Sequence, residues 1–211
     1  MKSVLAFGDS LTWGAIPGSD DRHQFSDRWP NVLEQGLGNS VRVIENGLNG
    51  RTTVHEDHFS PHRNGADHLP GLLEAHSPLD LVIIMLGTND LNHRHGGRAF
   101  EAMWGIDRLV EIILHHPYTR GMGRPEILLV APPHLRVATS EPDYHGYFGA
   151  AIEESAKLAA AYERIASERG CRNFDASTVA TVSELDGCHL DAENTRAIGT
   201  GLMPVVRSLL Q

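Results

Sequence analysis

One run of the sequence, residues 79–86, limits the possible folds more than any other. It reads LDLVIIML, and after its second residue it is apolar without alternation. A strand of this kind is buried on both faces, as happens at the centre of a parallel sheet covered by helices. Residues 127–131, ILLVA, predict a second strand of the same kind. We therefore expect an α/β protein.

The remaining segments alternate between short apolar runs and longer amphipathic ones, which favours a parallel sheet with helices on both faces. The chain has 211 residues and no linker rich in Pro, Gly or Ser, so we expect one domain, residues 1–211. Further strands are predicted at residues 3–7, 41–45 and 171–174, and helices at residues 27–37, 98–115, 148–168 and 194–210.

Residues 51–70 do not fit this alternation. The segment is polar, carries four histidines and two prolines, and is predicted to form a long loop. Loops of this length usually shape a binding site or an interface.

The composition excludes several classes of partner. The formal net charge is 18 − 27 = −9, and no basic block is present, so nucleic acid is not an expected partner. Two cysteines, Cys171 and Cys188, do not make the disulfide framework of a secreted protein. The apolar run before Asp9 is too short for a signal-peptide core, and no run reaches eighteen apolar residues. We expect a soluble cytoplasmic protein that does not bind membranes.

Ser10 follows the first predicted strand within the sequence GDSL, where a helix is expected to begin. Open parallel sheets place their sites at the carboxyl ends of the strands, so a serine here is a candidate nucleophile. The alternative is a helix cap, since Ser and Asp accept hydrogen bonds from the first free N–H groups of a helix. This stretch alone leaves both interpretations open.

A nucleophilic serine needs a base within hydrogen-bond reach, and the base needs an orienting partner. Asp186 and His189 supply such a pair, with Gly187 permitting a tight loop between them. The Asp186 carboxylate would accept the Nδ1–H of His189 and leave Nε2 free. A chain with 13 histidines also produces such pairs by chance, so this pair gains meaning only with the other stretches.

Two further stretches follow predicted strands and supply candidate oxyanion donors. Asn89 lies in the sequence GTND after residues 79–86, and its side-chain amide can donate to a carbonyl oxygen that gains charge. Gly50 follows residues 41–45, and without a side chain its backbone N–H can approach a substrate closely. Taken alone, each stretch is explained equally well by a turn.

Together, these stretches resemble the GDSL, or SGNH, family of esterases and lipases, over residues 8–189. The defining residues of that family are a serine, a glycine, an asparagine and a histidine. Ser10 matches the nucleophile, and Gly50 and Asn89 match the oxyanion residues. Asp186 and His189 match the acid–base block.

The resemblance implies a three-layer α/β/α sandwich around a parallel, flavodoxin-like sheet, the SGNH hydrolase fold. It implies that Ser10 attacks an ester carbonyl, that His189 is the base and later the acid, and that Asp186 orients the imidazole. It also implies an oxyanion site made by the N–H groups of Ser10 and Gly50 and the side chain of Asn89. No cofactor and no metal are implied.

Longer stretches resemble one branch of the family, the aryl esterases that include a mycobacterial acyltransferase, also called a perhydrolase. This branch implies short-chain aryl or alkyl esters as substrates, with acyl transfer to alcohols or peroxide as a further activity to test. It also implies a homo-oligomer, an octamer. One departure is that the acyltransferase has alanine where this chain has Gly50, and another is the histidine-rich loop, so the balance of transfer and hydrolysis stays open. The matching stretches are residues 7–14, 47–53, 64–66 and 79–90.

Leu11, Trp13 and Thr88 flank the matched residues and are the candidate substrate-binding residues. Leu11 and Trp13 have an alternative role, which is to pack the first helix against the sheet.

Three competing hypotheses stay open. A carbohydrate acetylesterase of the same fold would use the same catalytic residues. A non-catalytic binding module is disfavoured, because Asp9 puts an acidic side chain where a bound anion would lie. A metal-dependent hydrolase would use imidazole and carboxylate ligands, although no His-x-x-x-His pair falls on a predicted helix. Its candidate ligands are His55, Asp57, His58, His62 and His68, with His93 and His95 on another loop.

Overall fold

The strand predicted at residues 79–86 forms the centre of the sheet. The structure is a computed structural model that describes residues 1–139 and 151–211. In it β3, Leu81–Met85, is buried along its whole length and pairs in parallel with β1, Lys2–Gly8, and β4, Glu126–Ala131. The edge strands β2, Val41–Gly47, and β5, Arg172–Asp175, complete the parallel order β2-β1-β3-β4-β5.

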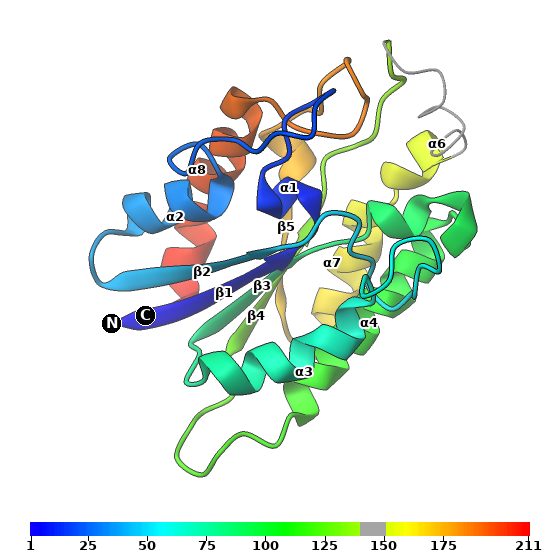
Figure 1. The fold of residues 1–211 in the computed structure, drawn as a ribbon. Coiled ribbons are helices and arrows are strands. Elements are labelled where there is room, and N and C mark those ends of the chain that lie inside the picture. The colour runs from blue at the N-terminus through cyan, green and yellow to red at the C-terminus, as the bar shows by residue number, and fades with distance from the viewer. Residues whose placement is uncertain (140–150) are drawn as a thin grey trace.

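Helices cover both faces of this sheet, which confirms the expected α/β/α sandwich (Figure 1). On one face, α2, Trp29–Leu37, packs against α8, Ala192–Leu209. On the other face, α4, Ala99–His115, packs between α3, Gly65–His76, and α7, Leu158–Arg169. The shorter described helices are α1, Ser10–Trp13, and α6, Ala151–Ser155, and the 3₁₀ turns are η1, Asn89–Leu91, η2, His93–His95, and η3, Ala176–Thr178.

The segment predicted as a loop over residues 51–70 is a loop only as far as Asn64. The Asn64 side chain accepts a hydrogen bond from the N–H of Ala66 and begins α3. Leu69 and Leu73, four residues apart, then face the core together and stabilise the helix by burial. Pro70 lies inside α3, so the proline that suggested a loop does not end the helix.

The helix predicted at residues 148–168 is two helices in its described part. A turn at Ala156 and Lys157 separates α6 from α7, and residues 148–150 lie outside the described residues. α7 continues to Arg169 and ends at Gly170, which has a positive φ of 70°. Within residues 1–139 and 151–211, every helix is too short or too polar to cross a lipid bilayer.

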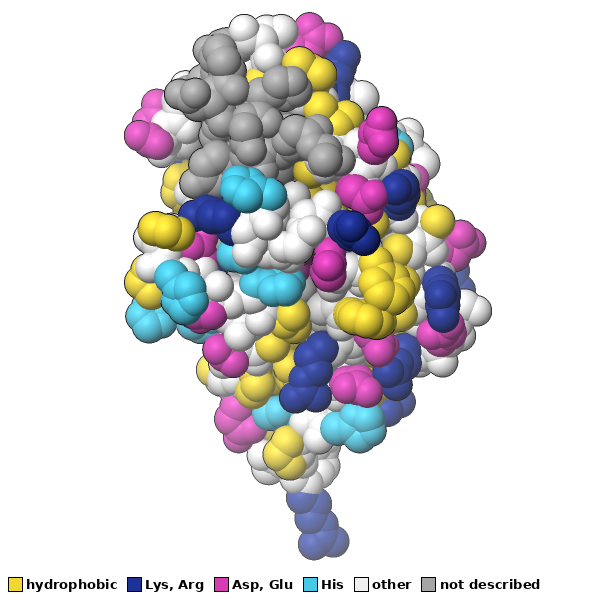
Figure 2. Space-filling view, turned by 90° about the vertical axis from the view of Figure 1, so that its right-hand side faces the viewer, with side chains coloured by type: hydrophobic (Ala, Val, Ile, Leu, Met, Phe, Trp, Pro, Cys, Tyr) yellow, Lys and Arg dark blue, Asp and Glu magenta, His cyan; other side chains and the backbone are white. Residues whose placement is uncertain are grey.

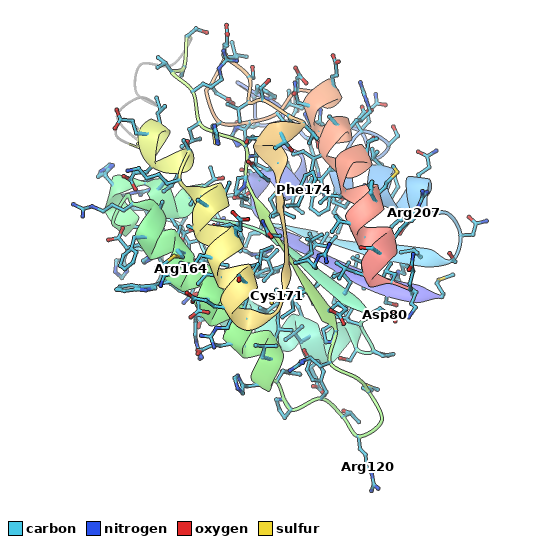
Figure 3. The ribbon with its side chains drawn as sticks, turned by 180° about the vertical axis from the view of Figure 1, so that it is seen from behind. Asp80, Arg120, Arg164, Cys171, Phe174 and Arg207 are labelled. Carbon is cyan, nitrogen blue, oxygen red and sulfur yellow. The ribbon has the colours of Figure 1, made fainter. Side chains whose placement is uncertain are left out.

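The two edges of the sheet have different neighbours. On β2, the outward N–H of Val43 donates to Glu34 Oε2 at 2.6 Å, so a side chain from α2 takes the place of another strand. At the other edge, β5 lies between α7 and α8, with Cys171 just before its first residue and Phe174 near its end (Figure 3).

Glycines allow α1 to lie close to the ends of two strands. A Cβ at Gly47 would overlap the backbone nitrogen and Cα of Trp13, and a Cβ at Gly8 would overlap the side chain of Thr12. Because backbone atoms cannot move aside as a flexible side chain can, position 47 has room only for glycine. This close approach holds Ser10 against the carboxyl end of the sheet.

The close approach at Gly47 predicts a loss of stability on substitution. Gly47→Ala should lower the free energy of unfolding by about 1–3 kcal/mol or more, because the added methyl overpacks the α1 backbone. Gly71→Ala is the matched control, since this helical glycine has nothing within 4 Å of an added Cβ. It should raise stability by about 0.5–1 kcal/mol. Urea unfolding monitored by circular dichroism measures both, and equal effects of the two substitutions would contradict the explanation.

Candidate active site

The predicted site residues meet at the carboxyl ends of three neighbouring strands. Ser10 follows β1, Gly50 follows β2 and Asn89 follows β3. The strand order changes direction between β1 and β3, which is where open α/β sheets form their binding crevices. The loop before α8 brings Asp186 and His189 to the same edge.

Asp9, rather than Ser10, caps α1. Its Oδ1 accepts the N–H of Leu11 at 2.9 Å, and Ser10 is the first residue of the helix. The hydroxyl of Ser10 is therefore free of the capping role that the sequence left open. It lies 3.1 Å from Nε2 of His189, and Ser10 is 7% exposed.

Asp186 and His189 form the pair that their spacing suggested. Nδ1 of His189 lies 2.8 Å from Oδ2 of Asp186. A carboxylate can only accept, so Nδ1 carries the proton and Nε2 is left to accept one from Ser10. The Oδ1 of Asp186 also accepts the backbone N–H groups of Cys188 and His189, each at 3.0 Å.

These hydrogen bonds keep the Asp186 carboxyl ionised. Burial would raise its pKa, but the ring of His189 and the backbone N–H groups of His189 and Cys188 outweigh burial and lower the pKa of Asp186 to about 2. Asp186 is therefore negatively charged at neutral pH.

Residues 14–23 form hydrogen bonds that hold the loop of Asp186 and His189 in place, and the sequence did not predict these contacts. The N–H of Gly18 donates to Oδ2 of Asp186 at 3.1 Å. The ring Nε2 of His23 lies 2.8 Å from the carbonyl oxygen of Leu190, and the backbone N–H of His23 donates to Gly14. Two of the three donors are backbone N–H groups, which cannot be recognised from the type of residue that carries them.

Gly50 lies in a tight turn at the end of β2. The N–H of Arg51 donates to the carbonyl of Leu48 at 3.0 Å, which places Gly50 at the third position of the turn with φ of 76°. That position favours glycine. Neither the N–H of Gly50 nor that of Ser10 donates to a residue that the structure describes, so both are available to an oxyanion.

The side-chain amide of Asn89 is held by two acceptors. Its Nδ2 donates to the carbonyl oxygen of Arg51 at 3.0 Å and to Oδ2 of Asp9 at 3.4 Å. The next residue, Asp90, is fully buried and accepts both the N–H and the hydroxyl of Thr53. Asp90 thereby ties η1 to the segment that follows Gly50, and the sequence did not indicate this role.

Arg51 is a second residue whose function in the site the sequence did not indicate. Its guanidinium donates to the carbonyls of Gly8 and Asn46 at 2.8 and 2.7 Å and lies 4.2 Å from the ring centre of Phe7. Burial lowers the pKa of Arg51 to about 10, against the opposing effect of Asp9. A buried charge directly after Gly50 joins the ends of β1 and β2.

The three candidate substrate-binding residues lie in different surroundings. Leu11 is 3% exposed and belongs to the core beneath α2 and α8, so packing accounts for its side chain. Trp13 is partly exposed and lies under the guanidinium of Arg22 at 4.9 Å. Thr88 is buried directly before η1. A role in substrate binding stays a prediction for all three.

The histidine-rich loop does not assemble the predicted metal ligands. The ring of His55 stacks on that of His95 at 5.4 Å, and Nε2 of His95 lies 3.8 Å from Asp57. Arg94 also faces Asp57, at 3.3 Å. Over the described part of the chain, no three side chains of His, Cys, Asp or Glu are grouped to hold a metal ion.

Comparisons with known proteins agree with this geometry. A model of the GDSL-like lipase/acylhydrolase family matches residues 6–195. A solved carbohydrate acetylesterase family member from Sinorhizobium meliloti is 48% identical, with a TM-score of 0.97 over 100% of this chain and 99% of that chain. The native aryl esterase of M. smegmatis is 39% identical, with a TM-score of 0.94 over 100% of both chains.

A second S. meliloti protein, described as a carbohydrate acetylesterase, is 36% identical, with a TM-score of 0.94 over 99% of this chain and 100% of that chain. A search of curated protein sequences finds no match. The similar structures thus include both aryl esterases and carbohydrate acetylesterases.

The lowered pKa of Asp186 predicts acid sensitivity. Its pKa is about 2 in the folded chain and about 3.9 in an unfolded one, so the unfolded state binds the proton more readily. Stability contributed by Asp186 is present above about pH 4 and is lost as the pH falls to about 2. Urea midpoints measured over this range should decrease less steeply in Asp186→Asn than in the wild type.

Other carboxylates with a lowered pKa, such as Asp80 and Asp191, contribute to the wild-type slope. The difference between the two proteins is therefore the quantity to compare. If the urea midpoints of the wild type and of Asp186→Asn fell with the same slope against pH, the pKa of Asp186 would be the same in the folded and unfolded chains, which would contradict the prediction.

Proposed function

Because the chain belongs to the GDSL-like lipase/acylhydrolase family, we propose that it cleaves short-chain acyl esters through an acyl-enzyme on Ser10. It is a carboxylic ester hydrolase of the GDSL type, and we assign the activity to a single domain, residues 1–211. The observation that carries the proposal is the hydrogen-bonded chain from Asp186 through His189 to Ser10, with distances of 2.8 and 3.1 Å.

The proposed reaction moves one proton in each of its two halves. His189 Nε2 takes the proton of Ser10 as Oγ attacks the ester carbonyl, and then gives it to the departing alkoxide. Asp186 stays ionised and stabilises the imidazolium that forms in between. A water molecule then repeats the sequence on the acyl-enzyme, releasing the acid and restoring Ser10.

Three donors are proposed to stabilise the tetrahedral oxyanion. They are the backbone N–H groups of Ser10 and Gly50 and one N–H of the Asn89 side chain. The support is that the two backbone groups have no acceptor among the described residues and that Asn89 lies beside Asp9. Removal of one such donor typically costs about 10²- to 10³-fold in turnover.

The main test is Ser10→Ala. This substitution should lower kcat for 4-nitrophenyl acetate by at least about 10³-fold, because no nucleophile is left, while circular dichroism shows an unchanged fold. Ser208→Ala, at the exposed end of α8, is the matched control and should keep wild-type activity. Activity in Ser10→Ala near the wild-type value would refute the assignment. Full activity of the wild type in excess EDTA would refute the metal-dependent alternative.

We propose aryl and alkyl esters of short acids as the substrates, with acetylated carbohydrates as the second candidate. The first is supported by the likeness to the M. smegmatis aryl esterase, and the second by the likeness to the two S. meliloti proteins. The values of kcat/KM for 4-nitrophenyl acetate and for an acetylated oligosaccharide, measured on the same preparation, distinguish the two.

Acyl transfer to alcohols or peroxide is proposed as a second outcome of the same acyl-enzyme. Its share depends on how well the site excludes water during deacylation. The ratio of new ester to free acid, measured in water that contains a simple alcohol, tests this part of the proposal.

We also propose a homo-oligomer, an octamer by resemblance to the aryl esterase branch. Phe100 and Trp104, one turn apart on α4, are 51% and 60% exposed, with ring centres 4.2 Å apart. Figure 2 shows apolar side chains gathered among charged ones on the side of the molecule that α4 covers. Exposed aromatic pairs of this kind are typical of interfaces, and the mass of the assembly in solution is the measurement that decides.

A further inference from the structure

Asp9 is a buried carboxyl group inside the site that the proposed proton transfers do not use. It is fully buried, and its Oδ1 accepts the N–H of Leu11 at 2.9 Å. Its other oxygen, Oδ2, lies 3.4 Å from Nδ2 of Asn89. One carboxyl group thus connects the turn between β1 and α1 to η1, which follows β3.

The amide of Asn89 is oriented by acceptors on both sides. One N–H meets the carbonyl of Arg51 at 3.0 Å, and the other meets Asp9. A flipped amide would turn its oxygen toward two acceptors, so only one orientation is favourable. Since Nδ2 carries two hydrogens, an oxyanion that receives one must displace one of these acceptors. The longer contact, with Asp9, is the weaker of the two and gives way more easily.

We propose that Asp9 is a positioning residue for ester hydrolysis, whose Oδ2 keeps one N–H of Asn89 ready for the oxyanion and releases it as the oxyanion forms. This inference rests on the proposed role of Asn89 as an oxyanion donor. The dipeptide Asp9-Ser10 would then supply both the nucleophile and the acceptor that aligns a donor for it.

The electrostatic surroundings of Asp9 favour this release. Burial raises the pKa of Asp9 to about 7, against the opposing effects of the Leu11 N–H, His189 and Arg51, and the nearby carboxyl of Asp90 adds to the increase. Near neutral pH, part of the population therefore carries a proton on this carboxyl. A carboxyl that is partly neutral competes less strongly with an oxyanion for the amide hydrogen than a permanent carboxylate would.

The test separates the two hydrogen bonds of Asp9. In Asp9→Asn the oxygen can still accept the Leu11 N–H, but the new amide then faces Asn89 donor to donor. In Asp9→Ser the hydroxyl can still cap α1 but is too short to reach Asn89. Asp175→Asn is the matched control, because Asp175 also caps a short helix, η3, through the N–H of Ser177.

We expect both Asp9 variants to lower kcat for 4-nitrophenyl acetate by about 10-fold or more, with KM within about twofold of wild type. Asp175→Asn should change neither. Asn89→Ala alone should lower kcat by about 10²- to 10³-fold. Adding either Asp9 substitution to Asn89→Ala should cause no further loss, because Asp9 acts only through Asn89.

If the Asp9 substitutions lowered kcat by the same factor in the wild type and in Asn89→Ala, the proposal would be overturned, since Asp9 would then act independently of Asn89. Wild-type kcat in Asn89→Ala would instead overturn the donor role of Asn89, and the Asp9 proposal with it. If neither Asp9 variant folds, the side-chain ¹⁵N resonance of Asn89 in the wild type, assigned with Asn89→Ala, replaces them. A shift of this resonance that follows the titration of the Asp9 carboxyl carbon supports the contact, and a resonance that stays constant while that carbon shifts overturns it.

Discussion

The buried guanidinium of Arg51 is the interaction on which the geometry of the site depends. It binds the carbonyl of Gly8 at the end of β1 and that of Asn46 in β2, while its own carbonyl accepts the amide of Asn89. A buried charge is costly unless hydrogen bonds replace its water. These carbonyls and the face of Phe7 replace part of that water, while Nε has no hydrogen-bond partner among the described residues. The guanidinium thus joins the ends of β1 and β2, and the backbone carbonyl of the same residue holds the amide that follows β3.

Two aspartates within the same site have pKa values that shift in opposite directions, because hydrogen bonds dominate at Asp186 and burial dominates at Asp9. Asp186 accepts three backbone N–H groups and the ring of His189, and its pKa falls to about 2. Asp9 is more deeply buried and has one short hydrogen bond and one long one, and its pKa rises to about 7. Pairs of carboxyl groups separated in this way can take different roles in one reaction.

The sheet and the location of the site could be predicted because they depend on residue types. An apolar run identifies β3, and the shared edge of parallel strands then brings Ser10 and Asn89 together. The capping of α1 by Asp9 could not be predicted, because either of two adjacent residues can cap and only backbone geometry decides. The hydrogen bond from the N–H of Gly18 to Asp186 could not be predicted either, since every residue except proline has such a donor. The start of α3 at Asn64 had a visible signal, a capping residue followed by spaced leucines, which the prolines and histidines obscured.

The hydrogen bond from Val43 to Glu34 has a consequence for how copies of this chain can meet. An uncovered edge strand invites another molecule to extend the sheet, and repeated extension leads to open-ended fibres. On β2, a carboxylate already occupies the N–H that such a strand would need. The carbonyl of an incoming strand would have to replace the charged carboxylate of Glu34 as the acceptor of this N–H, which is unfavourable because the carbonyl is neutral. Extension of the sheet past this part of β2 is thereby disfavoured, whereas the proposed association through a helical face could close into a finite assembly.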